Sequence, residues 1–255
     1  MKIVTLIENT SSRCDLACEH GLSLYIETGN YKILFDAGQS GAFADNAEAL
    51  GVDLRKVDFA VLSHGHYDHG GGLQRFLEIN DSAPIYLNRH AFEPHYNTSE
   101  KYIGLDLQLQ KNNRLIFTDG KFEIAEGISL HILDIPPADT SGLTVMENGV
   151  LRPEDFRHEQ YLLVEENGKK ICFSGCSHKG IENIAESFRP DILVGGFHFM
   201  KIEEKRVLEN AAQILLCHPT TYYTGHCTGE KQFAYLKTIM GKRLQYLATG
   251  AVLEI

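Results

Sequence analysis

The sequence predicts an α/β fold built from two successive strand-rich halves with interspersed helices. Short apolar segments of strand length recur along the 255 residues and alternate with segments of helical period. Polar residues stand repeatedly at the carboxyl ends of the apolar segments. Because α/β proteins gather ligands and reactive groups at that end of their strands, the pattern that predicts the fold also predicts where its chemistry lies.

The first half is expected to begin with a strand and a hairpin. Alternating apolar and polar residues on both sides of a turn at Gly29 are typical of a hairpin. Apolar residues three or four positions apart over 41–50 predict a helix that ends at Gly51. The expected strands are residues 1–8, 22–35 (the hairpin), 57–62 and 84–87, and the expected helices are 41–50 and 73–77.

The second half repeats this alternation with shorter strands. Asp-Gly, Glu-Gly and Asn-Gly pairs separate several of them and are typical of tight turns. The expected strands are residues 115–117, 122–124, 128–133, 160–165, 170–173, 191–194, 213–217, 244–248 and 250–253, and the expected helices are 181–188, 203–210 and 230–240.

Two long connections interrupt these elements. Residues 88–114 are polar, aromatic and weakly periodic, which is typical either of a lid or binding loop or of a plain surface excursion. His90, His95 and Tyr96 lie there and are weak candidates for a site. Residues 134–158 form the second connection.

Composition excludes several classes of protein. The formal net charge is −10 and no basic run occurs, which argues against a nucleic-acid partner, although a local pocket for a small anion stays open. No segment approaches eighteen uncharged apolar residues, so no membrane span is expected. The first eight residues are too short and too soon acidic for a signal peptide, and the six cysteines then indicate a reducing, cytoplasmic compartment.

The most informative stretch is the histidine motif, His64–His69, which reads His-Gly-His-Tyr-Asp-His and precedes three glycines. It follows the apolar segment 59–62 and holds four metal-capable side chains within six residues. Imidazole nitrogen and carboxylate oxygen suit first-row divalent ions. A polar loop that is rich in histidine by chance is the alternative. The sequence therefore predicts a metal site at the end of this strand.

The histidine motif resembles the H-x-H-x-D-H signature of the metallo-β-lactamase superfamily, and Asp36-Ala37-Gly38 resembles an early strand end of that family. The resemblance runs over nearly the whole chain. It implies one domain, residues 1–255, with an αββα four-layer sandwich of two mixed sheets flanked by helices. It also implies a dinuclear metal site at one edge. Segments 175–178, 195–198 and 225–229 resemble a subgroup, the dihydropterin-ribofuranosylaminobenzene-phosphate synthases of pterin biosynthesis.

The resemblance also implies roles for single residues. It assigns His64 and His66 to a first metal, and Asp68, His69 and the late His226 to a second. Asp36 would orient a ligand histidine.

The sequence departs from the family pattern after residue 173. Cys176 stands where a bridging aspartate is usual, and no Gly-His-Thr segment precedes the hairpin. His178 is the natural replacement ligand, Cys176 is a second candidate, and His158 is a third. The alternative for Cys176 is a small buried residue that lets the turn pack. If it binds metal, its soft thiolate would favour zinc.

His198 follows a glycine pair at a strand end, so it either contacts substrate as a proton donor or braces a loop. His20, His131 and His218 have no comparable setting and are expected to be ordinary surface or core residues.

The expected cofactors are two divalent ions, with zinc favoured by the histidine-rich set and manganese or iron as alternatives. Such ions activate water, and Asp68 would hold the nucleophile and shuttle its proton. Three functions follow: a hydrolase of a small anionic substrate such as a phosphate ester, a synthase-type transferase in pterin biosynthesis, and a metal-containing binding protein without turnover. The oligomeric state has no signal in the sequence.

Overall fold

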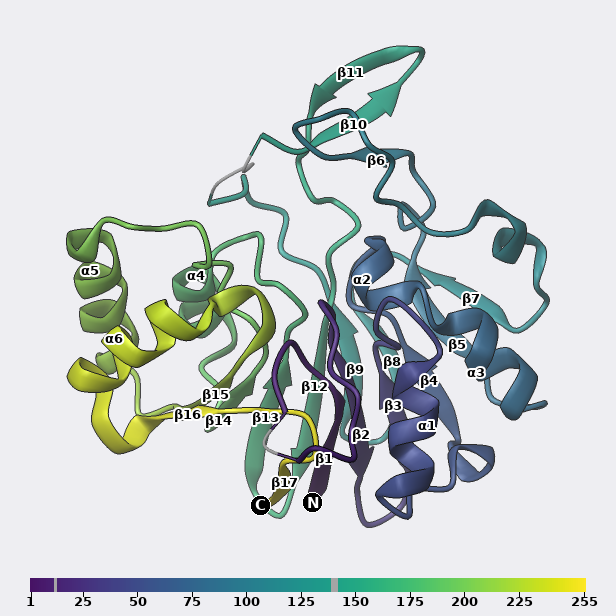
Figure 1. Ribbon diagram of the computed structural model, residues 1–255, viewed down its shortest axis with the longest axis horizontal. Helices are drawn as coiled ribbons and strands as arrows, with labels where there is room; N and C mark the ends of the chain where they lie inside the picture. The colour runs from purple at the N-terminus through teal and green to yellow at the C-terminus, as the bar shows by residue number, and fades with distance from the viewer. Residues whose placement is uncertain (12, 139–141) are drawn as a thin grey trace.

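Two seven-stranded mixed sheets form the middle of the molecule in the computed structural model, which describes residues 1–11, 13–138 and 142–255 (Figure 1). The first sheet has the order β17 (Val252–Glu254), β1 (Lys2–Ile7), β2 (Ser23–Glu27), β3 (Lys32–Phe35), β4 (Phe59–Val61), β5 (Ile85–Asn88) and β7 (Leu115–Thr118). The second has the order β16 (Leu244–Tyr246), β15 (Thr221–Thr224), β14 (Ile192–Val194), β13 (Lys169–Phe173), β12 (Tyr161–Glu166), β9 (Ile128–His131) and β8 (Phe122–Ala125).

Three hydrophobic cores lie between the four layers of the molecule. The central core joins side chains of both sheets, and the Phe35 and Phe173 rings meet there with centroids 5.8 Å apart. A second core packs the outer face of the first sheet against α1 (Ala42–Ala49) and α3 (Leu73–Ile79). The third packs the second sheet against α4 (Ile181–Phe188), α5 (Lys205–Leu216) and α6 (Glu230–Met240). This arrangement confirms the predicted αββα sandwich.

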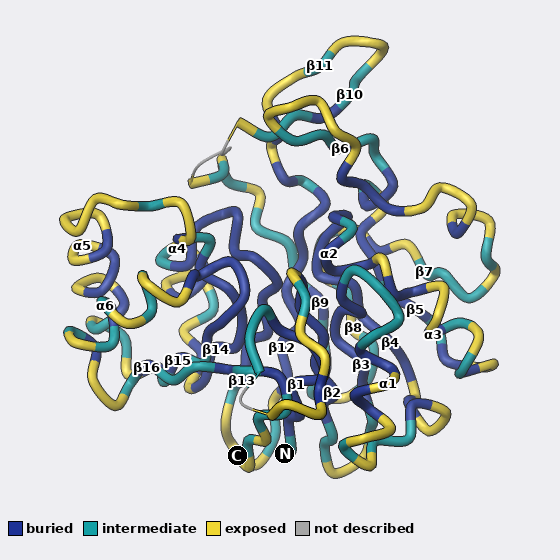
Figure 2. The backbone as a smooth tube through the Cα atoms, viewed as in Figure 1, coloured by how far each residue is buried: buried dark blue, intermediate teal, exposed yellow. Residues whose placement is uncertain are grey.

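A small outer sheet lies beyond the edges of the two large ones. It has the order β11 (Val150–Pro153), β10 (Thr144–Glu147) and β6 (His95–Tyr96), and Figure 1 shows it at the top of the molecule. Both long connections of the sequence contribute to it. Figure 2 shows buried backbone through the large sheets, mostly intermediate burial along β10 and mostly exposed residues along β11.

The strand predicted at 213–217 is wrong, because these residues lie at the end of α5 or just after it. The sequence there is a short apolar run, which strands and buried helix segments share. Leu208, Ala211, Ala212 and Leu215 form the buried stripe of the helix, and Ile214 is exposed. The strand is instead β15, which follows the helix and pairs in parallel with β14.

Short helical elements complete the chain. They are α2 (Tyr67–Gly70) and the 3₁₀ turns Leu54–Lys56, Leu107–Lys111, His226–Thr228 and Gly241–Arg243. Within the described ranges, no helix has both the length and the apolar character needed to cross a bilayer.

Candidate metal centre

The histidine motif (His64–His69) follows β4, which lies between β3 and β5 in the first sheet. Its chain passes so close to a neighbouring loop that a Cβ on Gly65 would lie 2.1 Å from the carbonyl oxygen of Ala91. The fold therefore requires glycine at this point. All four metal-capable side chains of the motif belong to buried residues, from 0% exposed for His69 to 9% for Asp68.

Three imidazoles converge to form what we call the first position. The ring centroids of His64, His66 and His178 are 4.7 Å apart for the first pair, 5.1 Å for His64 and His178, and 5.3 Å for His66 and His178. Burial and the neighbouring imidazoles lower the pKa of His64 and His178 well below the usual value, so both rings are neutral. A metal ligand must have this form.

Buried nitrogens at the first position lack hydrogen bonds. Among the described residues, neither His64 Nε2 nor either ring nitrogen of His178 has a hydrogen-bond partner. Leaving such atoms unpaired in the interior costs free energy. A divalent cation would satisfy them, so the residues present fit a metal ion.

Asp68, His69 and His226 form the second position. His69 Nε2 lies 3.1 Å from His226 Nε2, which in turn lies 3.3 Å from Asp68 Oδ2. Burial opposes ionisation of Asp68, but the surrounding histidines, His69 first, hold its pKa well below the ordinary value. The carboxylate is therefore ionised and suited to a cation.

Cys176 lies between the two positions. Its Sγ is 3.2 Å from His69 Nε2, and it forms close groups both with His64 and His178 and with His69 and His226. Burial, reinforced by the neighbouring Cys227 thiol, raises the pKa of Cys176 well above its usual range. It would therefore bind a cation only by giving up its proton to the metal.

Carboxylate and amide oxygens orient the histidines of the second position from behind. Asp36 Oδ2 lies 2.7 Å from His69 Nδ1, and Asp36 also accepts hydrogen bonds from the backbone and hydroxyl of Ser63. Asn9 Oδ1 lies 2.9 Å from His226 Nδ1. These contacts direct Nε2 of both rings toward the second position.

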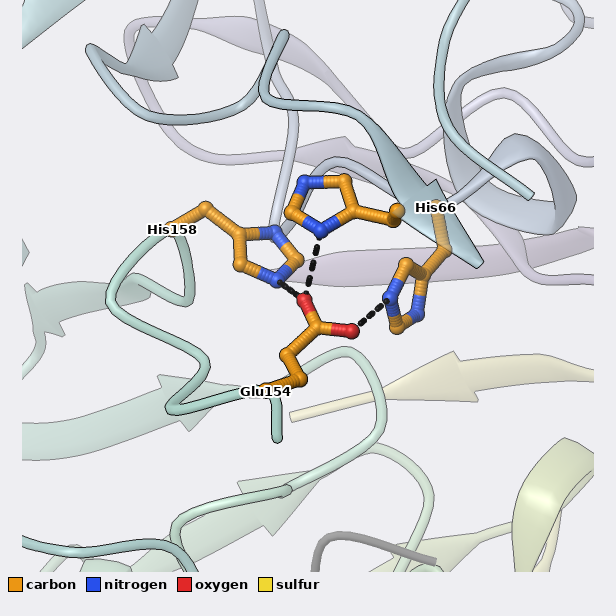
Figure 3. Close-up of side chains that lie close together, drawn as sticks. His66, Glu154 and His158 are labelled. Atoms are coloured by element: carbon orange, nitrogen blue, oxygen red, sulfur yellow. Dashed lines mark hydrogen bonds and ion pairs between the residues drawn. The ribbon is translucent and has the colours of Figure 1, made fainter. Parts of the chain in front are cut away.

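A buried carboxylate lies behind the first position. Figure 3 shows Glu154 between His66 and His158, with Glu154 Oε2 3.4 Å from His66 Nε2 and Glu154 Oε1 2.6 Å from His158 Nε2. His95, from β6, lies 2.7 Å from the same Oε1 through its Nδ1. Burial opposes ionisation of Glu154, but the facing His158 and His66 lower its pKa overall.

Both ring nitrogens of His158 have partners, and with His66, His95 and Glu154 it also belongs to a close group that could hold a metal ion. Its Nδ1 accepts a hydrogen bond of 2.7 Å from the backbone N–H of Gly65, and its Nε2 faces Glu154. Burial, followed by the neighbouring His95, lowers the pKa of His158 to about 3, which agrees with an unprotonated Nδ1. His158 therefore braces the histidine motif.

The bracing segment, His158-Glu159-Gln160, joins the two halves of the site. Glu159 accepts hydrogen bonds from the backbone N–H groups of His178 and Lys179, at 2.7 and 3.0 Å. Gln160 Nε2 donates to Leu62 O at 2.8 Å. One tripeptide thus fixes the chain on both sides of the first position.

Several site residues have strained backbones. Asp36, Ser177, His198 and His226 all have positive φ, between 47° and 61°, which side chains other than glycine seldom adopt. Such strain persists where the surrounding structure fixes it and is concentrated at functional sites.

Four site residues were missed or undervalued in the sequence. His20 was expected to be ordinary, but its Nε2 lies 3.3 Å from Asp68 Oδ2 and its ring lies 4.7 Å from that of His226. Glu154 and Phe156 had no signal in the second long connection. Phe156 stacks on His178 with centroids 4.0 Å apart and 8° between the planes. Polar residues directly after β1 were a usable signal for Asn9.

The other sequence candidates lie at different distances from the centre. His198 lies next to the first position, with its ring 4.3 Å from that of His178 and its backbone N–H 3.3 Å from the Sγ of Cys227. His90 lies 2.8 Å from Glu93, and Tyr96 packs against Tyr102; no close group of potential ligands in the described ranges includes either.

A family model for the metallo-beta-lactamase superfamily matches residues 17–226. The chain belongs to this superfamily. Two proteins of Methanocaldococcus jannaschii are similar to it over most of their length. One, 27% identical over 91% of this chain and 88% of its own, is named 7,8-dihydropterin-6-methyl-4-(β-D-ribofuranosyl)-aminobenzene-5'-phosphate synthase. The other, the uncharacterized protein MJ0448, is 28% identical over 93% of this chain and 94% of its own.

Solved structures agree with this family. Tm1679, described as a metal-dependent hydrolase of the beta-lactamase superfamily, aligns with a TM-score of 0.83 and 31% identity over 100% of this chain and 99% of that one. Zn²⁺-bound PqqB from Methylobacterium extorquens aligns over 100% of both chains with a TM-score of 0.63 and 13% identity, and shows the common fold.

Proposed function

We propose that this member of the superfamily is a metal-dependent hydrolase of a small anionic substrate, such as a phosphate ester. The observation that carries the proposal is the pair of adjoining positions, in which buried imidazole nitrogens without hydrogen-bond partners lie beside an ionised aspartate. His64, His66 and His178 would hold one ion, and Asp68, His69 and His226 a second, with Cys176 between them. When bound, divalent ions supply Lewis acidity and activate water at neutral pH.

The chain's own groups orient the reactants. Asp68 stays ionised, so its carboxylate can accept a hydrogen bond from an attacking water and fix its direction. We expect His198, which is half-buried beside the His178 ring, to hydrogen-bond the substrate and give a proton to the leaving group. Burial of the remaining ligands excludes bulk water and strengthens these interactions.

The proposal is tested with aryl phosphates and metal analysis. The purified protein, loaded with zinc or manganese, is expected to hold two ions per chain and to hydrolyse p-nitrophenyl phosphate or its bis ester. His66→Ala should remove the activity, because the first position loses an imidazole. His131→Ala is the matched control, since His131 lies on β9 outside every candidate ligand group of the described chain. Hydrolysis that survives in His66→Ala would refute the assignment.

A transferase is the second candidate, because the Methanocaldococcus protein named as a synthase aligns with 91% of the chain. In that case the same residues would bind a pterin diphosphate and an aminobenzene ribotide. Condensation of these two compounds, with no hydrolysis of any phosphate ester tested, would replace the hydrolase proposal with this one.

A further inference from the structure

A cavity adjoins the second position. It has a volume of about 700 Å³ and lies between the segment after β14, the start of α5 and the first turns of α6. His226 and Asn9 form the wall of the cavity that faces the metal centre. A molecule bound in this cavity would therefore reach the side of the second position directly.

The lining of the cavity also carries a small excess of positive charge. Lys201, Lys205 and Lys231 line the cavity together, in a chain whose formal net charge is −10. Lys205 Nζ lies over the Tyr235 ring at 5.2 Å, and within the described ranges none of the three lysines forms an ion pair with a carboxylate. Glu203 and Glu230 also line the cavity, so the lysine charges exceed the glutamate charges by one (three against two).

The remaining lining is apolar and aromatic. Leu208, Ile202 and Met200 contribute aliphatic surface, and Tyr235 and Tyr246 contribute rings. Small-molecule sites combine such surface with a few placed polar groups, and this cavity lies within their usual size of about 300–1,000 Å³.

The wall is built to hold its shape. Gln232 Nε2 donates to the backbone oxygens of Met200 and Ile202, at 3.1 and 3.0 Å, and so ties α6 to the segment before α5. Gly229 has φ +79°, a conformation that other residues rarely adopt, and a Cβ there would lie 3.0 Å from Met200 Cα, so the two segments are tightly packed. The cavity is therefore a formed feature of the fold.

We propose that this cavity is the substrate-specificity site, and that it binds a molecule with an aromatic body and a phosphate or carboxylate group. The body would lie against the tyrosines and aliphatic side chains, and the anionic group would be bound by Lys201, Lys205 and Lys231. The inference rests on the proposed function for the identity of the reacting bond, and it adds the part of the substrate that the metal centre does not contact.

Binding is measured by fluorescence on the metal-loaded protein with 1-naphthylphosphonate, which cannot be hydrolysed, and with 1-naphthoate. Lys201→Gln/Lys205→Gln/Lys231→Gln should raise the Kd at least about tenfold, because charge-assisted hydrogen bonds to the anion are lost. The control, Lys111→Gln/Lys121→Gln/Lys242→Gln, removes the same charge from three exposed lysines outside the cavity and should change the Kd less than about twofold. A larger effect on one probe would identify phosphate or carboxylate as the preferred group.

Equal Kd values for the two triple variants would overturn the inference, since the anion would then bind at the metals alone. Turnover separates this failure from failure of the proposed function. If an aryl phosphate is hydrolysed, the cavity variant should show a raised KM with kcat nearly unchanged. If no ester is hydrolysed while the Kd still depends on the three lysines, the cavity stands and the hydrolase assignment fails.

Discussion

The first and second positions are both buried, but their carboxylates are arranged differently. His64, His66 and His178 are three imidazoles at most 5% exposed, and the carboxylate of Glu154 faces the outer side of one of them, 3.4 Å from His66 Nε2. The second position contains its own carboxylate, Asp68, and adjoins the half-exposed side chain of His20. All-imidazole sites favour zinc, whereas a carboxylate also suits manganese and iron. The comparison predicts that the two positions differ in their metal preference rather than in their burial.

The largest expected effect comes from removing the charge at the second position. Asp68→Asn should reduce the metal content from two ions per chain to one and lower kcat at least about 100-fold, because the ionised ligand that orients water is lost. Metal analysis and aryl phosphate turnover measure both. Asp119→Asn, at an exposed residue bound to Arg89, is the control. Two retained ions with full activity would contradict the division between the positions.

Removing the carboxylate behind the first position should have the second-largest effect. Glu154→Gln leaves His66 without its charged partner, so affinity for the first ion should fall about 10–100-fold while the second is retained. Competition with a chromogenic chelator measures the two affinities separately. Glu147→Gln, in the outer sheet, is a matched control. Equal weakening at both positions would show that Glu154 acts on the whole centre.

Removing the stacking of Phe156 on His178 should have a smaller effect on metal binding at the first position. Phe156→Leu removes the ring that aligns His178, whose own nitrogens make no hydrogen bonds within the described chain. We expect a loss of about 1–2 kcal/mol in the free energy of unfolding and a fall of up to about tenfold in affinity for the first ion. Urea unfolding with and without metal separates the loss of stability from the loss of metal affinity. A stability loss with unchanged metal affinity would limit Phe156 to packing.

The smallest expected effect is a loss of folding free energy in acid, caused by the ion pairs of Arg157 with the outer sheet. Arg157 joins Glu93 and Glu147 at 2.7 Å each, and burial of Glu93 is outweighed by Arg157 and His90, so its pKa is lowered. A lowered carboxyl pKa stabilises the fold above the unfolded-state value, near 4.5, and this stability is lost as pH falls through the folded value. We expect Arg157→Gln to remove this pH dependence, at most about 1 kcal/mol, in unfolding titrations between pH 3 and pH 6.

The fold was predictable because apolar residues recur with the period of a strand or a helix in most of its elements. The histidine motif, in addition, indicates the family. The strand expected at 213–217 failed since its apolar run also satisfies the buried stripe of α5. The outer sheet was missed because β10 and β11 bury little apolar surface, so their alternation is weak.

The site was predictable where the ligands are consecutive and not where the fold brings remote residues together. The structure places His64 and His178 in one close group of potential ligands with Cys176, and His69 and His226 in another with Cys176. Asp68 lies in a group with His20 and His226, whereas His66 lies in a group with His95, Glu154 and His158, and the roles of all these residues as ligands remain predictions. Glu154 and Phe156 lie 88 positions from His66 and 22 from His178, respectively, in a connection with no periodicity. His20 precedes the hairpin in an irregular segment, where a lone histidine has no pattern to distinguish it.

The contact between Glu8 and His226 joins residues 218 positions apart, and Glu8 also accepts a hydrogen bond from Tyr246. β1 itself pairs with β17, at the other end of the chain. A nascent chain therefore presents the histidine motif long before the residue that completes the second position has been synthesised. Contacts of such long range form late and slow the folding of a domain. The second position can therefore form only after His226 has been synthesised and has reached His69, which lies 157 positions earlier in the chain.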